Sequence, residues 1–538
     1  MKKHNRSPIK KEEPFVLTQL YKDKIKENSY LGKKGYTIPK SALHENDYKT
    51  LKKELFVKPI IFNMQYGGKD MAEVQSFPVY RENINKMYIP RFYGIQRYGV
   101  PDKEKMQLGD TIQLAFPKSL RDYQEHIVDV YMKYVNTTLT SSSNKKGNGG
   151  ILEVPCGRGK TVMALKIISL LQKKTLIIVH KEFLMNQWIE RIDEFLPGAR
   201  VGKIQGPDFD IEDKDIVIGM IQTLYDKEYE ENTFSSFGLT IIDEVHRIGS
   251  EQFSRTLFKT ITPYMLGISA TVERKDKLTK VLYMFIGNKI YEEKREDDEE
   301  VQVRAITYQS GDEEFNETSL DFRGNPKYST MITKISNYNR RSNFIIQVLN
   351  DLRNQNSSKQ IMILAHNRSL LTYLYDAINH KNIGSVGYYI GGMKKEDLQT
   401  TESKEVVLAT YAMASEALDI KTLSTLIMAS PKTDITQSVG RILRTKHQQP
   451  IVVDIIDCHD IFQKQWVQRK RFYKKCNYKI FETNSNIYKD MDMNNWKCVF
   501  TPKEVKKQQQ LQQEEEPIYE EESEKPTCLL DASVFADL

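Results

Sequence analysis

Short apolar runs alternate with segments of helical spacing over most of the chain beyond residue 150. In a first series, strand-like runs begin at Ile151 and at residues 175–179, 215–218, 239–242 and 265–268, with helical spacing at 162–171 and 181–195. In a second series, strand-like runs lie at 361–364, 386–390, 405–409, 425–428 and 451–455, with helical spacing at 340–352, 368–378 and 435–443. Such alternation is typical of a parallel sheet with helices on both faces. The pattern predicts an α/β fold with two parallel-sheet domains in tandem.

The flanking segments have a different character. Residues 1–30 are rich in Lys and Asn and are predicted to be a basic mobile arm. Residues 31–115 contain short β-like runs at 55–62, 77–80 and 87–93, which indicates a small N-terminal domain. An amphipathic helix is expected at 120–135 and a flexible loop at 136–150. We therefore expect α/β domains over 116–300 and 301–480, then a C-terminal extension over 481–538.

Composition narrows the class of protein. The chain has 538 residues, of which 39% are hydrophobic and 28% charged, as expected for a multidomain globular protein. It contains no apolar run long enough to cross a membrane, and no signal peptide is expected. Five scattered cysteines without a CxxC pair favour a reducing, intracellular compartment and argue against structural zinc. Residues 503–538 carry ten acidic and four basic residues, so we expect a disordered acidic tail.

One stretch has the pattern of a phosphate-binding loop. Residues 151–161 read Ile-Leu-Glu-Val-Pro-Cys-Gly-Arg-Gly-Lys-Thr, a strand, a tight turn and a helix start. In such a loop, backbone N–H groups face an anion, Lys160 adds a positive charge and Thr161 offers a hydroxyl to Mg²⁺. Val154 stands where the usual loop has its first glycine. Alone, a Gly-Lys-Thr turn could also be an ordinary loop, but the residues downstream favour a nucleotide site.

Three further motifs support that hypothesis. Asp243 and Glu244 end a buried strand about 80 residues later, where the first carboxylate can orient Mg²⁺ and the second can deprotonate a water molecule. The stretch 267–271, Gly-Ile-Ser-Ala-Thr, ends the next strand. Arg441 and Arg444 share a helix face and suit a phosphate group from another domain, although surface ion pairs would also explain them.

Together these motifs resemble the superfamily 2 helicases and translocases over about residues 115–460. Their order is Leu-Arg-Asp-Tyr-Gln at 120–124, the phosphate loop, Asp-Glu-Val-His at 243–246, Ser-Ala-Thr at 269–271 and Gln-Ser-Val-Gly-Arg-Ile-Leu-Arg at 437–444. Within the superfamily, residues 155–157 resemble the branch of the DNA translocase of the general transcription and repair factor. Residues 88–94, Tyr-Ile-Pro-Arg-Phe-Tyr-Gly, resemble the transcript-release DNA helicases of poxviruses and of other large cytoplasmic DNA viruses.

The resemblance implies two RecA-like domains and a role for each motif residue. Adenine would be read by Gln124 with help from Arg121. Phosphates would be held by Pro155, Cys156, Gly157, Arg158, Gly159, Lys160 and Thr161, with Cys156 as a packing residue. Mg²⁺ would be held by Thr161 and Asp243, and Glu244 would be the general base. The γ-phosphate would be approached by Gln437, Arg441 and Arg444. Coupling would involve Ser269 and Thr271, and nucleic-acid contacts would involve Lys181, Thr223 and Thr410.

The function implied is that of an ATP- and Mg²⁺-dependent DNA helicase or translocase of a large DNA virus. It would act in transcript release or in repair and replication, in the host cytoplasm (the viral factory) and in the virion, with viral RNA polymerase or transcription factors as partners. An RNA helicase is the nearest alternative, and a non-catalytic nucleic-acid-binding scaffold is a more distant one. The basic, aromatic-bearing stretch 464–479 could hold nucleic acid or pack the second domain.

Overall fold

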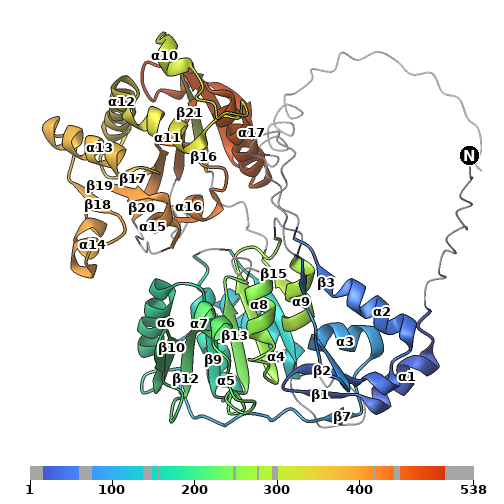
Figure 1. Cartoon of the computed structure of the whole chain (residues 1–538). Helices are drawn as coiled ribbons and strands as arrows, with labels where there is room; N and C mark the ends of the chain where they lie inside the picture. The colour runs from blue at the N-terminus through green and yellow to red at the C-terminus, as the bar shows by residue number, and fades with distance from the viewer. Residues whose placement is uncertain are drawn as a thin grey trace, which may run out of the picture.

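The computed structural model describes residues 16–59, 76–136, 148–155, 157–245, 250–274, 278–293, 301–416, 420, 422–441 and 449–502. These residues form three sheet-based units in chain order (Figure 1). Two of the units are the predicted parallel-sheet domains, and the third is the smaller N-terminal domain. No helix in the described ranges is both long and apolar enough to span a membrane.

The N-terminal unit is a sheet of strand order β5-β6-β2-β1-β7 with helices packed on one face, together with a separate two-stranded sheet of β3 and β4. Its elements are α1 (Gln19–Asn28), β1 (Tyr30–Gly32), β2 (Gly35–Pro39), η1 (Lys40–Ala42), α2 (Glu45–Glu54), β3 (Phe56–Val57), β4 (Phe77–Pro78), β5 (Arg81–Glu82), β6 (Lys86–Ile89), α3 (Arg91–Tyr98) and β7 (Lys103–Glu104). The prediction of a mobile arm through residue 30 was wrong for residues 19–28. Helix α1 is capped by Thr18 and buries Ile25 in the core.

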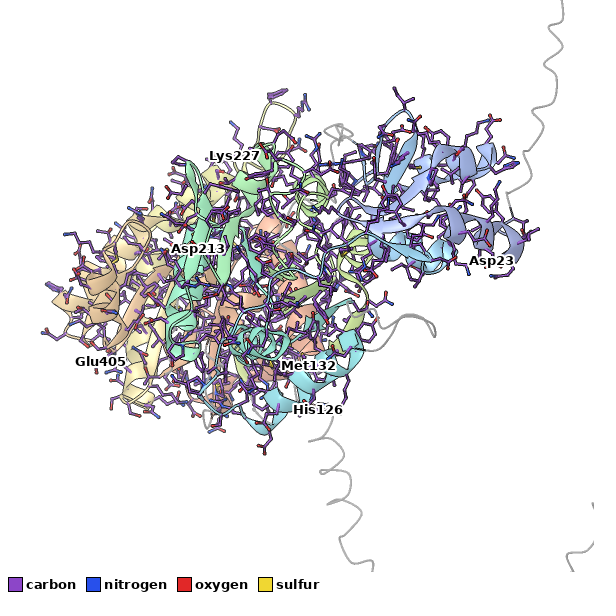
Figure 2. All side chains as sticks on the ribbon, turned by 90° about the horizontal axis from the view of Figure 1, so that it is seen from below. Asp23, His126, Met132, Asp213, Lys227 and Glu405 are labelled. Carbon is purple, nitrogen blue, oxygen red and sulfur yellow. The ribbon has the colours of Figure 1, made fainter. Side chains whose placement is uncertain are left out.

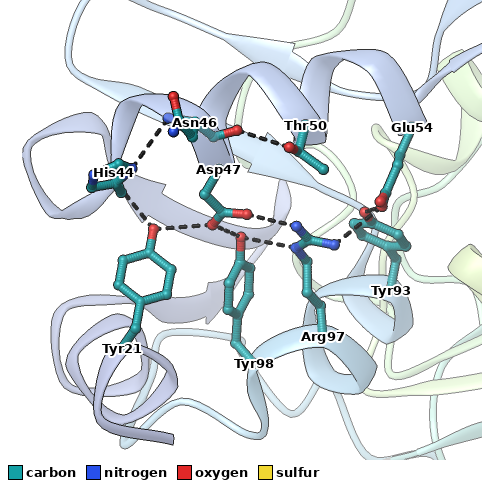
Figure 3. A network of polar contacts seen from close by, with 9 residues as sticks. All are labelled: Tyr21, His44, Asn46, Asp47, Thr50, Glu54, Tyr93, Arg97 and Tyr98. Atoms are coloured by element: carbon teal, nitrogen blue, oxygen red, sulfur yellow. Dashed lines mark hydrogen bonds and ion pairs between the residues drawn. The ribbon is translucent and has the colours of Figure 1, made fainter. Parts of the chain in front are cut away.

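A polar network ties the helices of this unit together (Figure 3). Asp47 of α2 is fully buried and accepts hydrogen bonds from the guanidinium of Arg97 at 2.6 Å, the Tyr98 hydroxyl at 2.5 Å and the Tyr21 hydroxyl at 3.0 Å. A carboxylate so enclosed is stable only because its partners replace the lost water. One side chain thus joins α1, α2 and α3.

Replacing Asp47 by alanine should lower the free energy of unfolding by about 3–5 kcal/mol, because Arg97 would lose its buried partner. Chemical denaturation followed by circular dichroism measures the change. Glu45→Ala on the same helix is the control, since its pair with Lys49 is largely exposed and should contribute little to stability. Equal effects of the two substitutions would contradict this account.

The first α/β domain has the strand order β11-β10-β12-β9-β13-β14-β8-β15, and every pairing except that of β11 with β10 is parallel. Its elements are α4 (Asp122–Asn136), β8 (Gly149–Glu153), α5 (Lys160–Leu171), β9 (Thr175–Val179), α6 (Glu182–Phe195), β10 (Val201–Gln205), β11 (Asp208–Phe209), β12 (Ile216–Met220), α7 (Ile221–Asp226), β13 (Leu239–Asp243), α8 (Ser250–Leu257), β14 (Tyr264–Ser269), α9 (Thr279–Ile286) and β15 (Lys289–Glu292). Separate apolar clusters fill its two faces.

The loop predicted at 136–150 ends earlier than expected. Residues 137–147 lie outside the described ranges, but Gly149 and Gly150 already belong to β8. A Cβ at Gly149 would lie 2.1 Å from the carbonyl oxygen of Ile286, so this strand position excludes a side chain. The Gly-Gly pair that resembled a loop is therefore a close backbone approach within the sheet.

The second α/β domain has the strand order β18-β19-β17-β20-β21-β16-β22-β23 and confirms the predicted fold class of two parallel-sheet domains. Its elements are β16 (Gln302–Tyr308), α10 (Glu313–Asn316), α11 (Tyr328–Asn337), α12 (Asn339–Gln355), β17 (Gln360–Ala365), α13 (Arg368–His380), β18 (Val386–Tyr389), α14 (Lys395–Glu402), β19 (Val406–Thr410), α15 (Tyr411–Glu416), β20 (Leu423–Met428), α16 (Thr436–Arg441), β21 (Ile451–Asp457), α17 (Asp460–Lys475), β22 (Lys479–Asn484), η3 (Met493–Asn495) and β23 (Lys497–Phe500).

The structure corrects one expectation for the C-terminal part and supports one of two alternatives for another. The boundary predicted at residue 480 falls inside β22, which pairs with β16 in parallel, and Trp496 packs in the core. The domain therefore continues through β23, and residues 503–538 lie outside the described ranges. Of the two roles considered for the basic stretch 464–479, the structure supports packing for Arg469 and Tyr473 of α17, which are both fully buried.

Candidate functional site

Three predicted motifs meet at one edge of the first sheet. Strands β13, β14 and β8 are parallel neighbours, and their register places Asp243 beside Ile268 and Ser269 beside Glu153. Their carboxyl ends therefore lie side by side, where open α/β sheets bind ligands. The phosphate loop, the acidic pair and the Ser-Ala-Thr turn all follow these ends, although they lie far apart in the sequence.

The loop between β8 and α5 has the backbone of an anion cradle. Gly157 and Gly159 take left-handed conformations, with φ of 85° and 81°, and α5 begins at Lys160. The Lys160 ammonium lies 3.4 Å from the Val154 carbonyl oxygen and 3.7 Å from a Glu244 carboxylate oxygen. A positive charge and a helix N-terminus therefore face the same space, which suits a phosphate group. Cys156 lies outside the described residues.

Val154 directly follows β8 and still bonds to the neighbouring strand, which explains the departure from the usual loop sequence. Its amide donates to the Ser269 carbonyl at 2.9 Å, and its side chain is buried in the apolar cluster beneath the loop. Extended backbone at this position does not need glycine. The tight turn begins only after Pro155.

Gln124 fastens the loop from the side. Its amide donates to the Arg158 carbonyl at 3.0 Å, and its oxygen accepts from the backbone N–H of Arg121 at 3.1 Å. The Tyr123 hydroxyl donates to the same carbonyl at 3.2 Å, and the Arg158 guanidinium lies 3.9 Å from the centroid of the Tyr123 ring. The same guanidinium pairs with Glu293 just after β15. The predicted adenine-reading residue thus contacts the phosphate loop directly.

Gly159→Ala should weaken nucleotide binding by about tenfold or more, because a residue with a Cβ is strained at positive φ. The new Cβ would also lie 2.3 Å from the Gln124 amide nitrogen. Titration with a fluorescent ATP analogue measures the affinity. Gly198→Ala is a matched control, since Gly198 has φ of 85° and no atom within 4 Å of the new Cβ. If both variants bind nucleotide as the parental protein does, Gln124 and the cradle are not coupled.

The acidic pair lies beside the cradle. Asp243 is buried and accepts a hydrogen bond from the Trp188 indole at 2.9 Å. Burial and the neighbouring Glu244 raise its pKa to about 6, although Trp188 and Lys160 act in the opposite direction. Glu244 has a left-handed backbone, with φ of 50°, which is uncommon for a residue with a side chain and occurs often at functional sites.

The donor set of this edge fits Mg²⁺. The Asp243 carboxylate and the Thr161 hydroxyl, at the start of α5, are oxygen ligands of the kind that this small cation prefers. A divalent cation would also favour the charged form of Asp243, which burial otherwise disfavours. The predicted metal ligands are therefore chemically consistent with their surroundings.

Ser269 joins the acidic pair to the following turn. Its hydroxyl donates to the Thr271 carbonyl at 2.6 Å and lies 3.5 Å from a Glu244 carboxylate oxygen. A change at Glu244 can therefore reach the turn through one side chain, as the coupling hypothesis for Ser269 and Thr271 requires.

The residues predicted to contact nucleic acid lie in both α/β domains. Lys181 follows β9, and Thr223 lies in α7 after the neighbouring strand β12, so both lie at the same sheet edge. The Thr223 hydroxyl already accepts the Gly206 amide at 3.0 Å. Thr410 ends β19 in the second domain. The structure does not test their contact with nucleic acid.

The predicted γ-phosphate residues are only partly described. Gln437 and Arg441 belong to α16, but the positions of their side chains are not described, and Arg444 lies outside the described residues. Their roles remain predictions. What the structure does describe is the loop 429–432, which leads from β20 toward α16.

Four consecutive carbonyl groups of this loop accept hydrogen bonds from buried or half-buried side chains. The carbonyls are those of residues 429, 430, 431 and 432, and the donors are Arg341 at 2.8 Å, the Tyr411 hydroxyl at 2.5 Å, the Tyr328 hydroxyl at 3.3 Å and Arg469 at 3.0 Å. The Ser430 hydroxyl also lies 2.8 Å from the His366 ring nitrogen. The loop is thus held by groups from five separate parts of the domain.

Two buried ion pairs anchor the arginine donors. Arg341 binds Asp457 with nitrogen–oxygen distances of 2.5 and 2.8 Å, and Arg469 binds Asp454 with 2.7 and 2.9 Å. All four side chains are fully buried in this domain. Fork-shaped pairs of this kind fix both partners in orientation as well as in position.

Sequence reasoning did not predict the contacts of Trp188, Tyr411 and these arginines. Trp188 has the spacing of an ordinary core residue on α6, with Met185 and Ile192 on the same face. Arg469 was hidden within a basic stretch. The only available signal was the presence of Asp454 and Asp457 in an otherwise apolar strand, since buried charges require partners.

His366 should make stability depend on pH. Burial and the nearby Lys432 lower its pKa from 6.5 to about 4. Between these values the unfolded chain binds a proton that the folded chain does not. The free energy of unfolding should therefore be highest above about pH 6.5 and fall toward pH 4, by up to about 1.4 kcal/mol per pH unit. Denaturant titrations at pH 7 and pH 5 compare the parental protein with His366→Gln, which should lose this part of the fall. The exposed His126→Gln is the control and should retain it.

Comparisons with known proteins agree with this geometry. The family model described as the type III restriction enzyme, res subunit, matches residues 117–274. A protein of Acanthamoeba polyphaga mimivirus, named provisionally as an ATP-dependent RNA helicase, is 34% identical over 455 residues, covering 83% of this chain and 85% of the relative. A protein of African swine fever virus with the same provisional name is 26% identical over 411 residues, covering 71% and 77%.

Two further matches are a protein that aligns with only part of this chain and a solved structure. The DNA 3'-5' translocase XPB2 of Sulfurisphaera tokodaii is 31% identical over 211 residues, covering 37% of this chain and 43% of that protein. Among solved structures, that of T4 UvsW aligns with 82% of this chain over 96% of the UvsW chain, at 18% identity and a TM-score of 0.32.

The strand order, the phosphate cradle and the acidic pair are together typical of a P-loop ATPase. The chain belongs to the superfamily 2 helicases, the ATP-dependent class that includes these viral relatives.

Proposed function

We propose that this chain is an ATP- and Mg²⁺-dependent DNA helicase or translocase whose turnover is stimulated by nucleic acid. The observation that carries the proposal is the convergence of Lys160, Glu244 and Ser269 on one sheet edge. Lys160 would hold the β- and γ-phosphates, and Thr161 and Asp243 would hold Mg²⁺. Glu244 would take the proton of the attacking water, and Ser269 would transmit the change to the turn at Thr271.

The second domain would complete the reaction. Gln437, Arg441 and Arg444 would close on the γ-phosphate, where two arginines would neutralise the charge that develops in the transition state. Closure and opening of the two RecA-like domains would move the chain along a strand. Lys181, Thr223 and Thr410 would contact the sugar-phosphate backbone, so binding should depend strongly on salt and weakly on sequence.

The choice of DNA rests on His246 and the Pro-Cys-Gly loop at 155–157, and on the likeness to the Sulfurisphaera tokodaii protein named as a DNA translocase. The names of the two viral relatives favour RNA, which is the second candidate. The viral relatives also support a role in a large DNA virus. There the enzyme would serve transcript release or repair and replication, in the cytoplasmic factory or the virion, with RNA polymerase or transcription factors as partners.

The test combines two variants with three nucleic acids. Lys160→Ala should weaken ATP binding, because it removes positive charge from the bound phosphates. Glu244→Gln should retain ATP binding and lose turnover by about 10² or more, because it removes the general base. Glu251→Gln, at a partly exposed site on α8, is the control.

Phosphate release is measured with single-stranded DNA, duplex DNA and RNA, alongside binding of a fluorescent ATP analogue. Turnover stimulated only by RNA would contradict the choice of DNA. Parental turnover by Glu244→Gln would contradict the assignment of the general base.

A further inference from the structure

The N-terminal sheet has two faces of opposite chemistry. Leu31, Tyr36 and Ile89 point to one side, where α1 and α3 cover them. The pairing register assigns the other side to a cross-strand row formed by Lys103 of β7, Tyr30 of β1, Thr37 of β2, Tyr88 of β6 and Arg81 of β5. Side chains alternate along a strand, so residues two positions from a member of this row share its face. These residues are Lys105 next to Lys103, Pro39 next to Thr37 and Lys86 next to Tyr88.

This outer face is basic and aromatic. Its strand positions contribute Arg81, Lys86 and Lys103, with Lys105 directly after β7, and no acidic residue of the paired strands points to this side. Lys103 and Lys105 are exposed. Lys34, in the turn between β1 and β2, adds a further positive charge. Among these cations, Arg81 donates to the Arg255 carbonyl of the first domain, and Lys34 pairs with Glu231 of that domain.

The tyrosine rings hold several of these cations in place. The Lys105 ammonium lies 4.6 Å from the centroid of the Tyr30 ring, and the Lys86 ammonium lies 5.5 Å from the same centroid. The Lys34 ammonium lies 5.5 Å from the centroid of the Tyr88 ring. A flexible lysine normally loses rotamer freedom on binding an anion, and cation–π contact reduces that loss in advance.

Nothing in the ATPase site uses this face. The N-terminal unit contacts the first domain through α3, where Arg91 donates to the Pro263 carbonyl at 2.8 Å, and through the turn that carries Lys34. It also contacts that domain through Arg81 and through β3 and β4, whose Val57 and Phe77 pack in a core cluster of the first domain. Figure 2 shows this unit, marked by Asp23, projecting beyond the first domain, marked by His126 and Asp213. The row from Lys103 to Tyr88 therefore belongs to a unit that extends away from the motor.

We propose that the outer face of the N-terminal sheet, from Lys103 and Lys105 across Tyr30 to Lys86 and Tyr88, binds the phosphodiester backbone of nucleic acid. The occupant is argued from charge: an array of cations with tyrosine hydroxyls and rings between them suits a chain of phosphates with bases attached. The inference rests on the proposed function to the extent that the chain binds nucleic acid. It adds a site outside the two motor domains, which would hold the strand while the domains open.

The experiment measures binding of a fluorescent single-stranded DNA oligonucleotide to the full chain, without nucleotide, over a range of salt concentrations. The test variant combines Lys86→Gln, Lys103→Gln and Lys105→Gln. The matched control combines Lys24→Gln, Lys49→Gln and Lys53→Gln, which remove the same charge from exposed positions on α1 and α2. Each lost phosphate contact should reduce the slope of log K against log salt by about 0.7, so the test variant should lose up to about 2.

The control should keep the parental slope, and both variants should keep the parental circular dichroism and ATPase activity without nucleic acid. Tyr30→Leu should also weaken binding, because it releases Lys86 and Lys105, whereas Tyr30→Phe should weaken it less. Equal slopes for the test variant, the control and the parental protein would overturn the proposed site and leave the proposed function intact.

Two other outcomes are distinguishable. A parental protein that does not bind any nucleic acid would overturn the proposed function, and the site with it. Poly-glutamate serves as a second probe for an acidic protein partner. If the test variant loses affinity for poly-glutamate but not for DNA, the face serves an acidic polypeptide and the proposal is wrong.

Discussion

The parallel pairing of β13, β14 and β8 is the constraint on which the nucleotide site depends. Backbone hydrogen bonds fix their register, and the register decides that Asp243 and Ser269 emerge beside the loop that carries Lys160. None of these residues is close to another in sequence. The 3.7 Å approach of Lys160 to Glu244 is therefore a result of strand order rather than of local turn geometry.

The second domain uses buried charge for a similar purpose. Removing an arginine and an aspartate from water is costly, and well-packed apolar residues would often stabilise a core as well. The ion pairs at Asp454 and Asp457 also have a positioning role. Each aspartate orients an arginine that donates a hydrogen bond to a carbonyl of the loop 429–432. Tyr411 binds the same loop and directly follows Thr410. A nucleic-acid strand bound at Thr410 would thus contact the residue next to Tyr411, whose hydroxyl binds the loop that leads to α16.

The sequence allowed the two sheets and the first-domain motifs to be predicted, because buried parallel strands such as 176–179 and 361–364 are apolar throughout. It failed where the pattern was ambiguous. Gly149 and Gly150 resembled a loop because the close approach of Ile286 leaves no sign in the local sequence. The helix α1 was missed because little more than Ile25 marks its buried face. The side-chain hydrogen bonds to the carbonyls of the loop 429–432 could not be predicted, since they depend on which arginine reaches which carbonyl.

The spacing of Asp454 and Asp457 also has a consequence for folding. Because they are three residues apart on β21, their side chains point to opposite faces, one toward α17 and the other toward α12. A slip of the strand by one residue would turn each carboxylate into the apolar layer on the wrong side. Apolar strands carry little information about alignment, since valine and isoleucine tolerate either face. Asp454 and Asp457 therefore fix the register of β21, because a single alignment of this central strand places both carboxylates beside their arginines.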